Sequence, residues 1–224
     1  MSVPDLLTDP NAVLLDRAQW RYGVAPDYRK ANASFAAEKT KDWEKGSLQD
    51  MVSNLVKNWE KEASYKLDPS EWRTIDKEKY RFSCNGGQKY TVEDMLRLGT
   101  YNALIGDTEL YSATNTDFET SHEVFRKAMP EGFAWEVLDV YSGPPEVAFK
   151  WRHWGKMTGK LTCPLGHGTL EAEPTNDTIE IFGMAIAKVE PENGFKITEI
   201  EIYYEPNQIM SQLAGKAKRI QVMV

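Results

Sequence analysis

The chain has 224 residues and a formal net charge of −7, and 41% of its residues are hydrophobic. This apolar content suffices for one large core and argues against global disorder, while the acidic balance argues against nucleic acid as the main partner. No segment approaches the ~20 apolar residues of a membrane helix, and residues 1–20 lack the basic start and apolar run of a secretory signal. We therefore expect a soluble cytoplasmic protein with no membrane partner, whose Cys84 and Cys163 are reduced.

The N-terminal part of the chain is expected to hold an arm and a first helix. Residues 1–28 carry scattered Pro and Asp, which predicts an extended arm that wraps the surface. Residues 28–45 look helical, with Phe35 and Trp43 as apolar anchors, and Gly46 interrupts the pattern.

The helix predicted over residues 48–65 is the clearest element of the chain. Ser47 is typical of an N-cap, with Asp50 three residues later as a variant of the capping box. Apolar residues follow at helical spacing, namely Met51, Leu55, Val56, Trp59 and Ala63. The side that faces water is expected to carry Lys57, Glu60, Lys61 and Glu62.

The middle of the chain predicts one short strand and two helices. The strand spans residues 80–84 and precedes an Asn-Gly-Gly turn. Thr91 caps a helix that runs to about Ala103, and a further helix covers residues 116–127, with His122 on its surface.

After Pro130 the pattern changes to β-strands. Four long runs are expected, over residues 133–141, 147–154, 178–189 and 195–204. A last helix follows over residues 206–215. Helices that precede strands in this way predict an α+β fold, in which a helix group packs on one mostly antiparallel sheet. We expect one domain over residues 29–215 and a tail over residues 216–224.

The strand VAFKWRH, residues 147–153, has two different faces. Alternation places Val147, Phe149, Trp151 and His153 on one apolar side, which should point inward. Lys150 and Arg152 lie on the other side, where we expect them to bind acidic groups.

Two further strands are expected to complete a concave site. Trp135, Asp139 and Tyr141 share one face of their strand. In the last strand the choice of inner face is open: if Tyr203 and Glu205 point inward, they converge with Asp139 and His153 on one concavity lined by Trp135 and Trp151. Aromatic walls with a few polar groups are typical of a small-molecule pocket, and a slip of one residue would reverse each assignment.

Several stretches resemble the plant pathogen-related protein family. They include KTKDWEKGSLQDMVSNLVKNWE, LGTYNALI, GFAWEVLDVYS, VAFKWRHWGKMTG, IEIFGMAIAKVE and ITEIEIYYEPNQIMSQL, and the similarity spans residues 27–213. That family is similar to the SnoaL-like polyketide cyclases of the nuclear-transport-factor-2-like superfamily. The resemblance implies a cone-shaped α+β barrel in which a curved sheet wraps one long helix, with a pocket between them. It also implies a homodimer that pairs through the outer surfaces of the sheets.

The same resemblance implies a catalytic residue. In the cyclases an acidic residue at the end of the last long strand acts as general acid and base in a metal-free, cofactor-independent ring closure. Glu205 stands at this place, where the cyclases carry Asp. Between Gly155 and Gly159 the chain has no histidine, although the cyclases carry one in the matching segment.

The candidate catalytic residues are Glu205, His153 and Asp139. An aromatic pocket would raise the pKa of Glu205 by desolvation, as a general base requires, and His153 would shuttle a proton or donate to a substrate carbonyl. In the alternative reading Glu205 is a solvated strand-end acid, and His153 is a core histidine held by a backbone carbonyl or by Glu205. The candidate substrate-binding residues are Trp151, Tyr203, Trp135, Phe149, Trp59 and Tyr141.

We expect no metal site and no cofactor. His167 and Cys163 supply two ligands, whereas a zinc site uses three or four. The first functional hypothesis is an acid–base enzyme of the cyclase, isomerase or dehydratase type, acting on a small hydrophobic, ring-containing metabolite such as a polyketide. The second is a binding protein for such a metabolite. The third is an interaction module whose cone is filled by its own side chains, such as Phe82, Phe182 and Met184.

Overall fold

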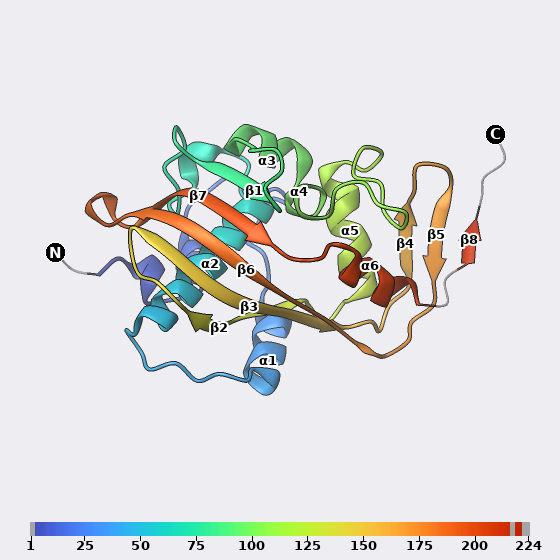
Figure 1. Cartoon of the computed structure of the whole chain (residues 1–224), viewed down its shortest axis with the longest axis horizontal. Coiled ribbons are helices and arrows are strands. Elements are labelled where there is room, and N and C mark those ends of the chain that lie inside the picture. The colour runs from blue at the N-terminus through green and yellow to red at the C-terminus, as the bar shows by residue number, and fades with distance from the viewer. Residues whose placement is uncertain (1–2, 216–217, 221–224) are drawn as a thin grey trace.

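The computed structural model describes residues 3–215 and 218–220 and shows an α+β architecture (Figure 1). The arm carries two short 3-10 helices, Asp5–Leu7 and Ala12–Leu15. The α-helices are α1 (Arg29–Glu38), α2 (Leu48–Tyr65), α3 (Val92–Leu98), α4 (Thr100–Ile105), α5 (Phe118–Ala128) and α6 (Asn207–Ala214). The strands are β1 (Arg81–Cys84), β2 (Ala134–Val140), β3 (Glu146–Lys156), β4 (Leu161–Pro164), β5 (Thr169–Ala172), β6 (Thr178–Glu190), β7 (Lys196–Tyr203) and β8 (Lys218–Ile220).

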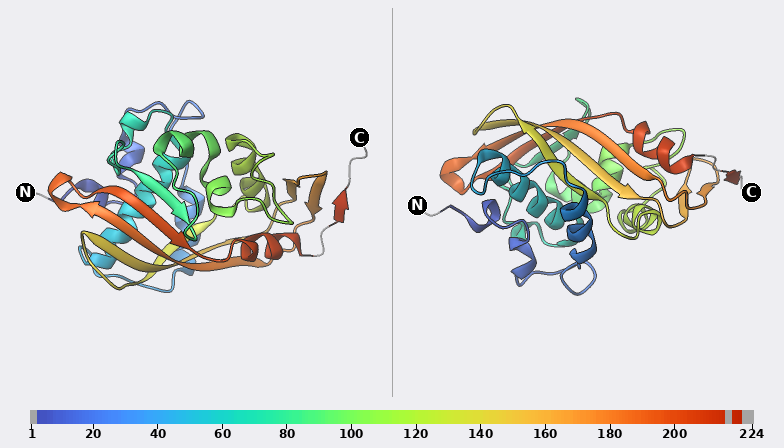
Figure 2. Two further views of the ribbon diagram at one scale, coloured as in Figure 1. Left: turned by 45° about the horizontal axis from the view of Figure 1, so that its top comes forward. Right: turned by 90° about the horizontal axis from the view of Figure 1, so that it is seen from below.

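The main sheet has five strands in the order β1-β7-β6-β3-β2. Adjacent strands in this sheet run antiparallel, except that β1 runs parallel to β7. The sheet is a curved layer, and α2 crosses its concave side (Figures 1 and 2). The expected α+β fold with a curved sheet around a long helix is therefore confirmed, although the described strands end at β1 and β2 and do not close into a barrel.

A second sheet, β4-β5-β8, lies near α5 and α6 at one end of the molecule (Figure 1). Neither β4 nor β5 was expected from the sequence. Residues 218–220 of the predicted tail pair with β5, and the rest of residues 216–224 lies outside the described residues. Among the described residues, no helix has the length and apolar character needed to cross a membrane.

Helix α2 has the bounds that the sequence predicts. The Ser47 hydroxyl accepts a hydrogen bond from the Asp50 amide at 3.3 Å, and the Asp50 carboxylate accepts one from the Gly46 amide at 2.9 Å. The first bond satisfies a backbone donor that the first turn of a helix leaves free, and the second ties the residue before the N-cap to the helix.

The expectation of a wet side on α2 is wrong. The arm covers that side: the Asn54 amide donates to the Leu7 carbonyl at 3.0 Å, and the Asn58 amide donates to the Leu6 and Asp9 carbonyls at 3.1 and 2.8 Å. Lys61 and Glu62 are consequently buried. A helix wedged between an arm and a sheet has little surface left for water.

Buried charges fasten the arm to the end of α2. Lys66 donates to Glu62 at 2.8 Å and to Asp16 of the arm at 2.7 Å. Glu62 also accepts from the amide and hydroxyl of Thr74, at 3.0 and 2.6 Å. The network satisfies the buried carboxylate on several sides, as burial of a charge demands.

Two predicted helices are shorter than expected. The helix over residues 28–45 ends at Glu38, because the following segment runs along β2: Thr40 donates to Glu136. The helix that begins after Thr91 divides into α3 and α4 at Gly99, whose φ of 84° no helix accommodates.

A β-bulge interrupts β2 between Val137 and Asp139. The Val137 carbonyl accepts a hydrogen bond from the Trp43 indole at 3.0 Å. A bulge shifts the alternation of side chains along a strand. Two odd-numbered residues, such as Val137 before the bulge and Asp139 after it, therefore lie on opposite faces of the sheet.

Candidate functional site

A cavity of about 340 Å³ lies between the concave face of the main sheet and α2. This volume is at the lower end of the ~300–1,000 Å³ typical of ligand pockets. Residues from α1, α4 and the arm complete its walls, which are mostly apolar. The hypothesis of a cone filled by its own side chains is wrong: Phe82 packs on Trp59 in the core, and Phe182 is exposed on the outer face.

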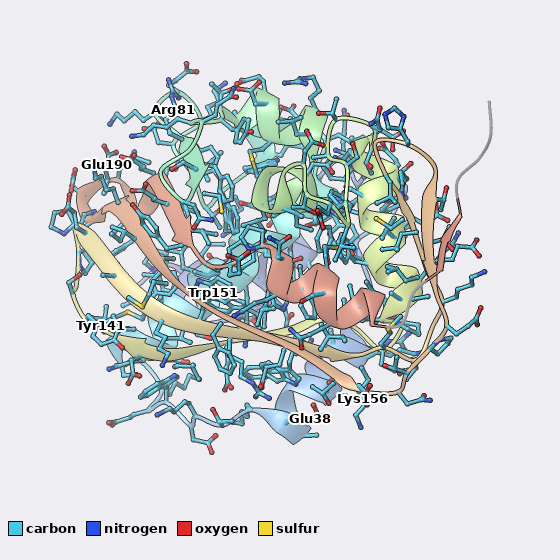
Figure 3. All side chains as sticks on the ribbon, turned by 45° about the vertical axis from the view of Figure 1, so that its right-hand side comes forward. Glu38, Arg81, Tyr141, Trp151, Lys156 and Glu190 are labelled. Atoms are coloured by element: carbon cyan, nitrogen blue, oxygen red, sulfur yellow. The ribbon has the colours of Figure 1, made fainter. Side chains whose placement is uncertain are left out.

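Four of the predicted aromatic residues line the cavity. They are Trp59, Trp135, Phe149 and Trp151. Trp151 lies in the middle of the molecule, whereas Tyr141 lies at its periphery (Figure 3). The Trp59 indole donates to the Tyr80 hydroxyl at 3.0 Å, and Trp135 meets Phe149 edge to face with ring centroids 6.1 Å apart. These contacts hold the aromatic rings in fixed orientations.

Small residues on β6 make room for the tryptophan. Gly183 is the register partner of Trp151, and a Cβ at Gly183 would come within 2.2 Å of the indole. Ala185 and Ala187 continue the same face of β6 and also line the cavity. The glycine therefore lets a large ring lie flat against the neighbouring strand.

His153 lines the cavity at the end of the apolar face of β3, as the sequence predicts. Its Nδ1 bonds to the Ala134 carbonyl at 2.8 Å, and its ring stacks on Phe133 at 3.6 Å. Burial lowers the pKa of His153 to about 3, so the ring is neutral at physiological pH. Because a carbonyl only accepts, Nδ1 carries the hydrogen and Nε2 remains as an acceptor.

Glu60 supplies the carboxyl group of the cavity wall, and sequence reasoning missed it. The Tyr28 hydroxyl lies 2.7 and 3.0 Å from its two oxygens, and the Ser64 hydroxyl donates at 3.4 Å. Burial raises the pKa of Glu60, while the charge of Lys61 and the hydrogen bonds oppose the shift. Desolvation also raises the pKa of Tyr28 well above its ordinary value, so this phenol stays a donor.

Lys57 also lines the cavity, one turn before Glu60. Its ammonium lies 3.2 Å from the centroid of the Phe35 ring on α1. Burial, together with the charge of Lys61, lowers the pKa of Lys57 to about 7. Lys57, Glu60 and Lys61, which the sequence pattern assigned to the water-facing side of α2, thus supply most of the charge on the cavity wall.

The other predicted site residues do not line the cavity. Glu205 is exposed and accepts from the Asn207 amide at 2.9 Å, at the start of α6. Asp139 lies opposite Lys150 on the outer face, because the bulge reverses the alternation after Val137. Tyr203 and Tyr141 are 41% and 61% exposed.

The last strand turns its other face inward. Ile200, Ile202 and Tyr204 line the cavity, and the Tyr204 ring lies 5.8 Å from that of Trp151. Sequence reasoning left this choice open, and the pairing of β7 with β6 and β1 decides it.

The structure also tests the predictions for Arg152 and His122. Arg152 binds Glu136 at 3.0 Å and also Glu180 on the outer face, as expected. His122 is 3% exposed, so its prediction as a surface residue is wrong; its ring stacks on Phe118 at 4.2 Å. Within residues 3–215 and 218–220 no three His, Cys, Asp or Glu side chains gather in a way that could hold a metal ion.

A signal for Glu60 exists in the sequence. Leu48, Val52, Val56 and Glu60 are spaced by four residues, so they form one row along the helix. The first three are apolar and line the cavity, and the row carries Glu60 onto the same wall.

Comparison with known proteins identifies one curated relative in particular. The chain is 35% identical over 199 residues to the pathogen-related protein of Hordeum vulgare, covering 86% of this chain and 80% of the relative. No family model matches the chain. The resemblance noted from the sequence is confirmed by this relative.

Two solved structures that resemble this chain have low sequence identity and low TM-scores. A proposed SnoaL-like polyketide cyclase from Jannaschia sp. CCS1 is 13% identical with a TM-score of 0.42, over 78% of this chain and 99% of that one. A hypothetical protein of ketosteroid isomerase-like fold from Catenulispora acidiphila, in complex with trimethylamine, is 12% identical with a TM-score of 0.37, over 70% and 90%.

Proposed function

We propose that this chain, which belongs to the pathogen-related protein family, binds a small hydrophobic, ring-containing metabolite in its cavity and moves a proton on it. The observation that carries the proposal is Glu60, a carboxyl group on an otherwise mainly apolar wall. Burial raises its pKa toward the pH at which a group both takes and releases a proton. Glu205 and Asp139 are left out of the proposal because they lie away from the cavity.

We assign a separate role in this reaction to each polar group around the cavity. Glu60 takes a proton from the bound molecule or returns one, and the Tyr28 hydroxyl orients the carboxylate through its hydrogen bonds. His153, neutral with Nε2 as an acceptor, receives a hydrogen bond from a hydroxyl of the ligand. Aromatic walls hold a ring against these groups, so positioning and one acid–base group suffice for cyclisation, isomerisation or dehydration.

A second function, binding without turnover, is favoured by His153. A pKa of about 3 makes its ring a weak base, so this residue adds a hydrogen-bond acceptor and little basicity. An apolar cavity with an acceptor at one end is sufficient for a carrier or a sensor.

The test is an untargeted mass-spectrometric comparison of small-molecule extract from the source organism. Equal portions are incubated with the wild type, with Glu60→Gln and with Glu205→Gln, after circular dichroism has shown that each variant is folded. Glu205→Gln is the matched control, because this carboxylate is exposed away from the cavity. We expect one compound to be converted by the wild type and the control, and about 10²–10⁴-fold more slowly by Glu60→Gln.

Each other outcome has a defined meaning. Equal conversion by all three proteins contradicts the role of Glu60. Loss of conversion with Glu205→Gln alone would mean that Glu205, the acid at the end of the last strand, carries the reaction. A compound that all three retain unchanged favours the binding function. If nothing is retained or converted, the small-molecule function itself is wrong.

We further propose a cytoplasmic homodimer. Phe182, Met184 and Ile186 alternate along the outer face of β6, and Tyr203 lies beside Met184 on β7. This apolar row is typical of a surface that a partner covers, and a second copy of the chain presents the same row. Two free thiols, Cys84 and Cys163, are compatible with a reducing compartment.

A further inference from the structure

We infer that Lys57 is a nucleophilic amine, and that the cavity takes small hydrophobic aldehydes or ketones, which Lys57 captures as an imine. The inference names the chemical class of the ligand and rests on the proposed function in one respect, namely that the cavity takes a small molecule.

The surroundings of Lys57 differ from those of the next lysines along the chain. Lys61 donates to the carbonyls of Pro10 and Lys57 at 3.0 and 3.1 Å, and Lys66 binds two carboxylates. For Lys57 the described part of the chain shows a ring contact with Phe35 and neither an ion pair nor a hydrogen-bond acceptor. Its amine is therefore available to a molecule in the cavity.

The electrostatic setting favours the free amine. Burial and the charges of Lys61 and Lys39 lower the pKa of Lys57 from 10.5 to about 7. The negative charges of Glu136 and Asp50 act in the opposite direction and are outweighed. At pH 7 about half of these amines carry a lone pair, against roughly one in 3,000 for a lysine of ordinary pKa. Desolvation and an adjacent cation are the two ways in which proteins activate a lysine toward carbonyl groups.

Formation of the imine requires neither an oxidant nor a reductant. The Lys57 nitrogen attacks the carbonyl carbon and loses a proton to the carbonyl oxygen, which gives a carbinolamine. A proton from the Glu60 carboxyl group converts the hydroxyl of this intermediate to water. The water leaves as the nitrogen lone pair forms the carbon–nitrogen double bond of a protonated imine. The protonated imine restores the positive charge beside the Phe35 ring, where a cation already finds a favourable contact.

Glu60 is placed to assist the loss of water. It follows Lys57 by three residues on α2, so both side chains project from the same side of the helix, and both line the cavity. Its raised pKa keeps a larger fraction of the carboxyl group protonated than in water. A protonated carboxyl group donates to the departing hydroxyl and then balances the charge of the iminium.

The experiment is reductive trapping with benzaldehyde. The full chain is incubated at pH 7 with benzaldehyde and sodium cyanoborohydride, which reduces the imine to a stable benzylamine, and the modified lysines are mapped by peptide mass spectrometry. We expect Lys57 to be benzylated about tenfold or more faster than any exposed lysine. The site of modification in the wild type is the primary readout, so the result does not depend on the folding of a variant.

Variants and pH sharpen the result. Lys57→Arg removes the main adduct, whereas Lys41→Arg, at an exposed lysine, keeps it. The rate at Lys57 falls below pH 7 as the amine is protonated. Benzylation spread evenly over exposed lysines, with Lys57 no faster than they are, overturns the inference.

A parallel measurement separates this inference from the proposed function. Toluene has the same ring without the carbonyl group, and its binding is followed by the fluorescence of the tryptophans on the cavity wall. If toluene binds and no Lys57 adduct forms, the imine is wrong and the small-molecule cavity stands. If toluene does not bind and benzaldehyde does not react, both are wrong.

Discussion

Among single residues, Gly183 is the one on which the shape of the cavity depends most directly. Its ideal Cβ would lie 2.2 Å from the indole of Trp151 and 2.7 Å from the Tyr203 carbonyl. The substitution Gly183→Ala therefore forces the indole toward the cavity or shifts β6. We expect a loss of about 1–3 kcal/mol in the free energy of unfolding, measured by urea denaturation, together with weaker binding of toluene.

The matched control is Gly166→Ala, because an added Cβ there meets nothing within 4 Å. We expect its free energy of unfolding to change by less than ~0.5 kcal/mol. If Gly183→Ala is as stable as this control and binds toluene equally well, the close packing of β6 against Trp151 is wrong.

At the residue scale, prediction from sequence succeeded where one periodicity applied without interruption. His153 and Trp151 lie on the inner face because β3 pairs with β6 along its whole length in one register. Asp139 was misplaced because a bulge, which the residue pattern of β2 does not announce, reverses the faces after Val137. Glu60 was assigned to water because a polar side chain on a helix usually faces solvent, whereas here its row on α2 lines the cavity.

Among the elements, Lys66 joins the end of α2 to the arm, because its ammonium pairs with Glu62 of α2 and, at 2.7 Å, with Asp16 of the arm. The side chains of Lys66 and Glu62 are both 0% exposed and 2.8 Å apart. The substitution Lys66→Met leaves the charge of Glu62 without its cation. We expect a loss of ~3–5 kcal/mol in the free energy of unfolding, measured by urea denaturation at neutral pH.

A surface ion pair provides the comparison. The side chain of Lys79 is 57% exposed and pairs with Glu190. Lys79→Met should cost less than ~1 kcal/mol, because water and salt screen exposed pairs. Equal losses for the two variants would mean that the Lys66 network contributes no more than a surface contact.

At the element scale, the bounds of α2 were predictable because its cap and its apolar spacing agree. The division between α3 and α4 was not recognised, although Gly99 lies at the break, since a lone glycine is tolerated within many helices. Strands β4 and β5 are four residues each and surround a turn rich in glycine, so their pattern is too short to distinguish from a loop.

For the whole molecule, the proposed homodimer gives a direct prediction. Ile186 is 38% exposed on the outer face of β6, and a lysine there would place a charge in the middle of the proposed interface. We expect Ile186→Lys to convert a dimer to a monomer in analytical ultracentrifugation. Leu15→Lys, at an 83% exposed position of the arm, should leave the dimer intact. A wild type that sediments as a monomer contradicts the proposal.

The overall architecture was more predictable than the site. The order of helices before strands favoured an α+β fold, and the resemblance to the pathogen-related proteins implied a curved sheet around a helix. The openness of the sheet and its parallel strand β1 follow from pairings between residues more than a hundred positions apart. Such long-range pairings leave no local trace in the sequence.

One helix, α2, carries both the inner wall of the cavity and the anchor of the arm. Glu60 lines the cavity, and Asn58, two positions earlier on the same helix, donates to the Leu6 and Asp9 carbonyls of the arm. A molecule that binds only while α2 is in place therefore lowers the population in which the arm is detached, by the factor 1 + [L]/Kd. Resistance of the arm to a protease would then report how full the cavity is, whatever the occupant.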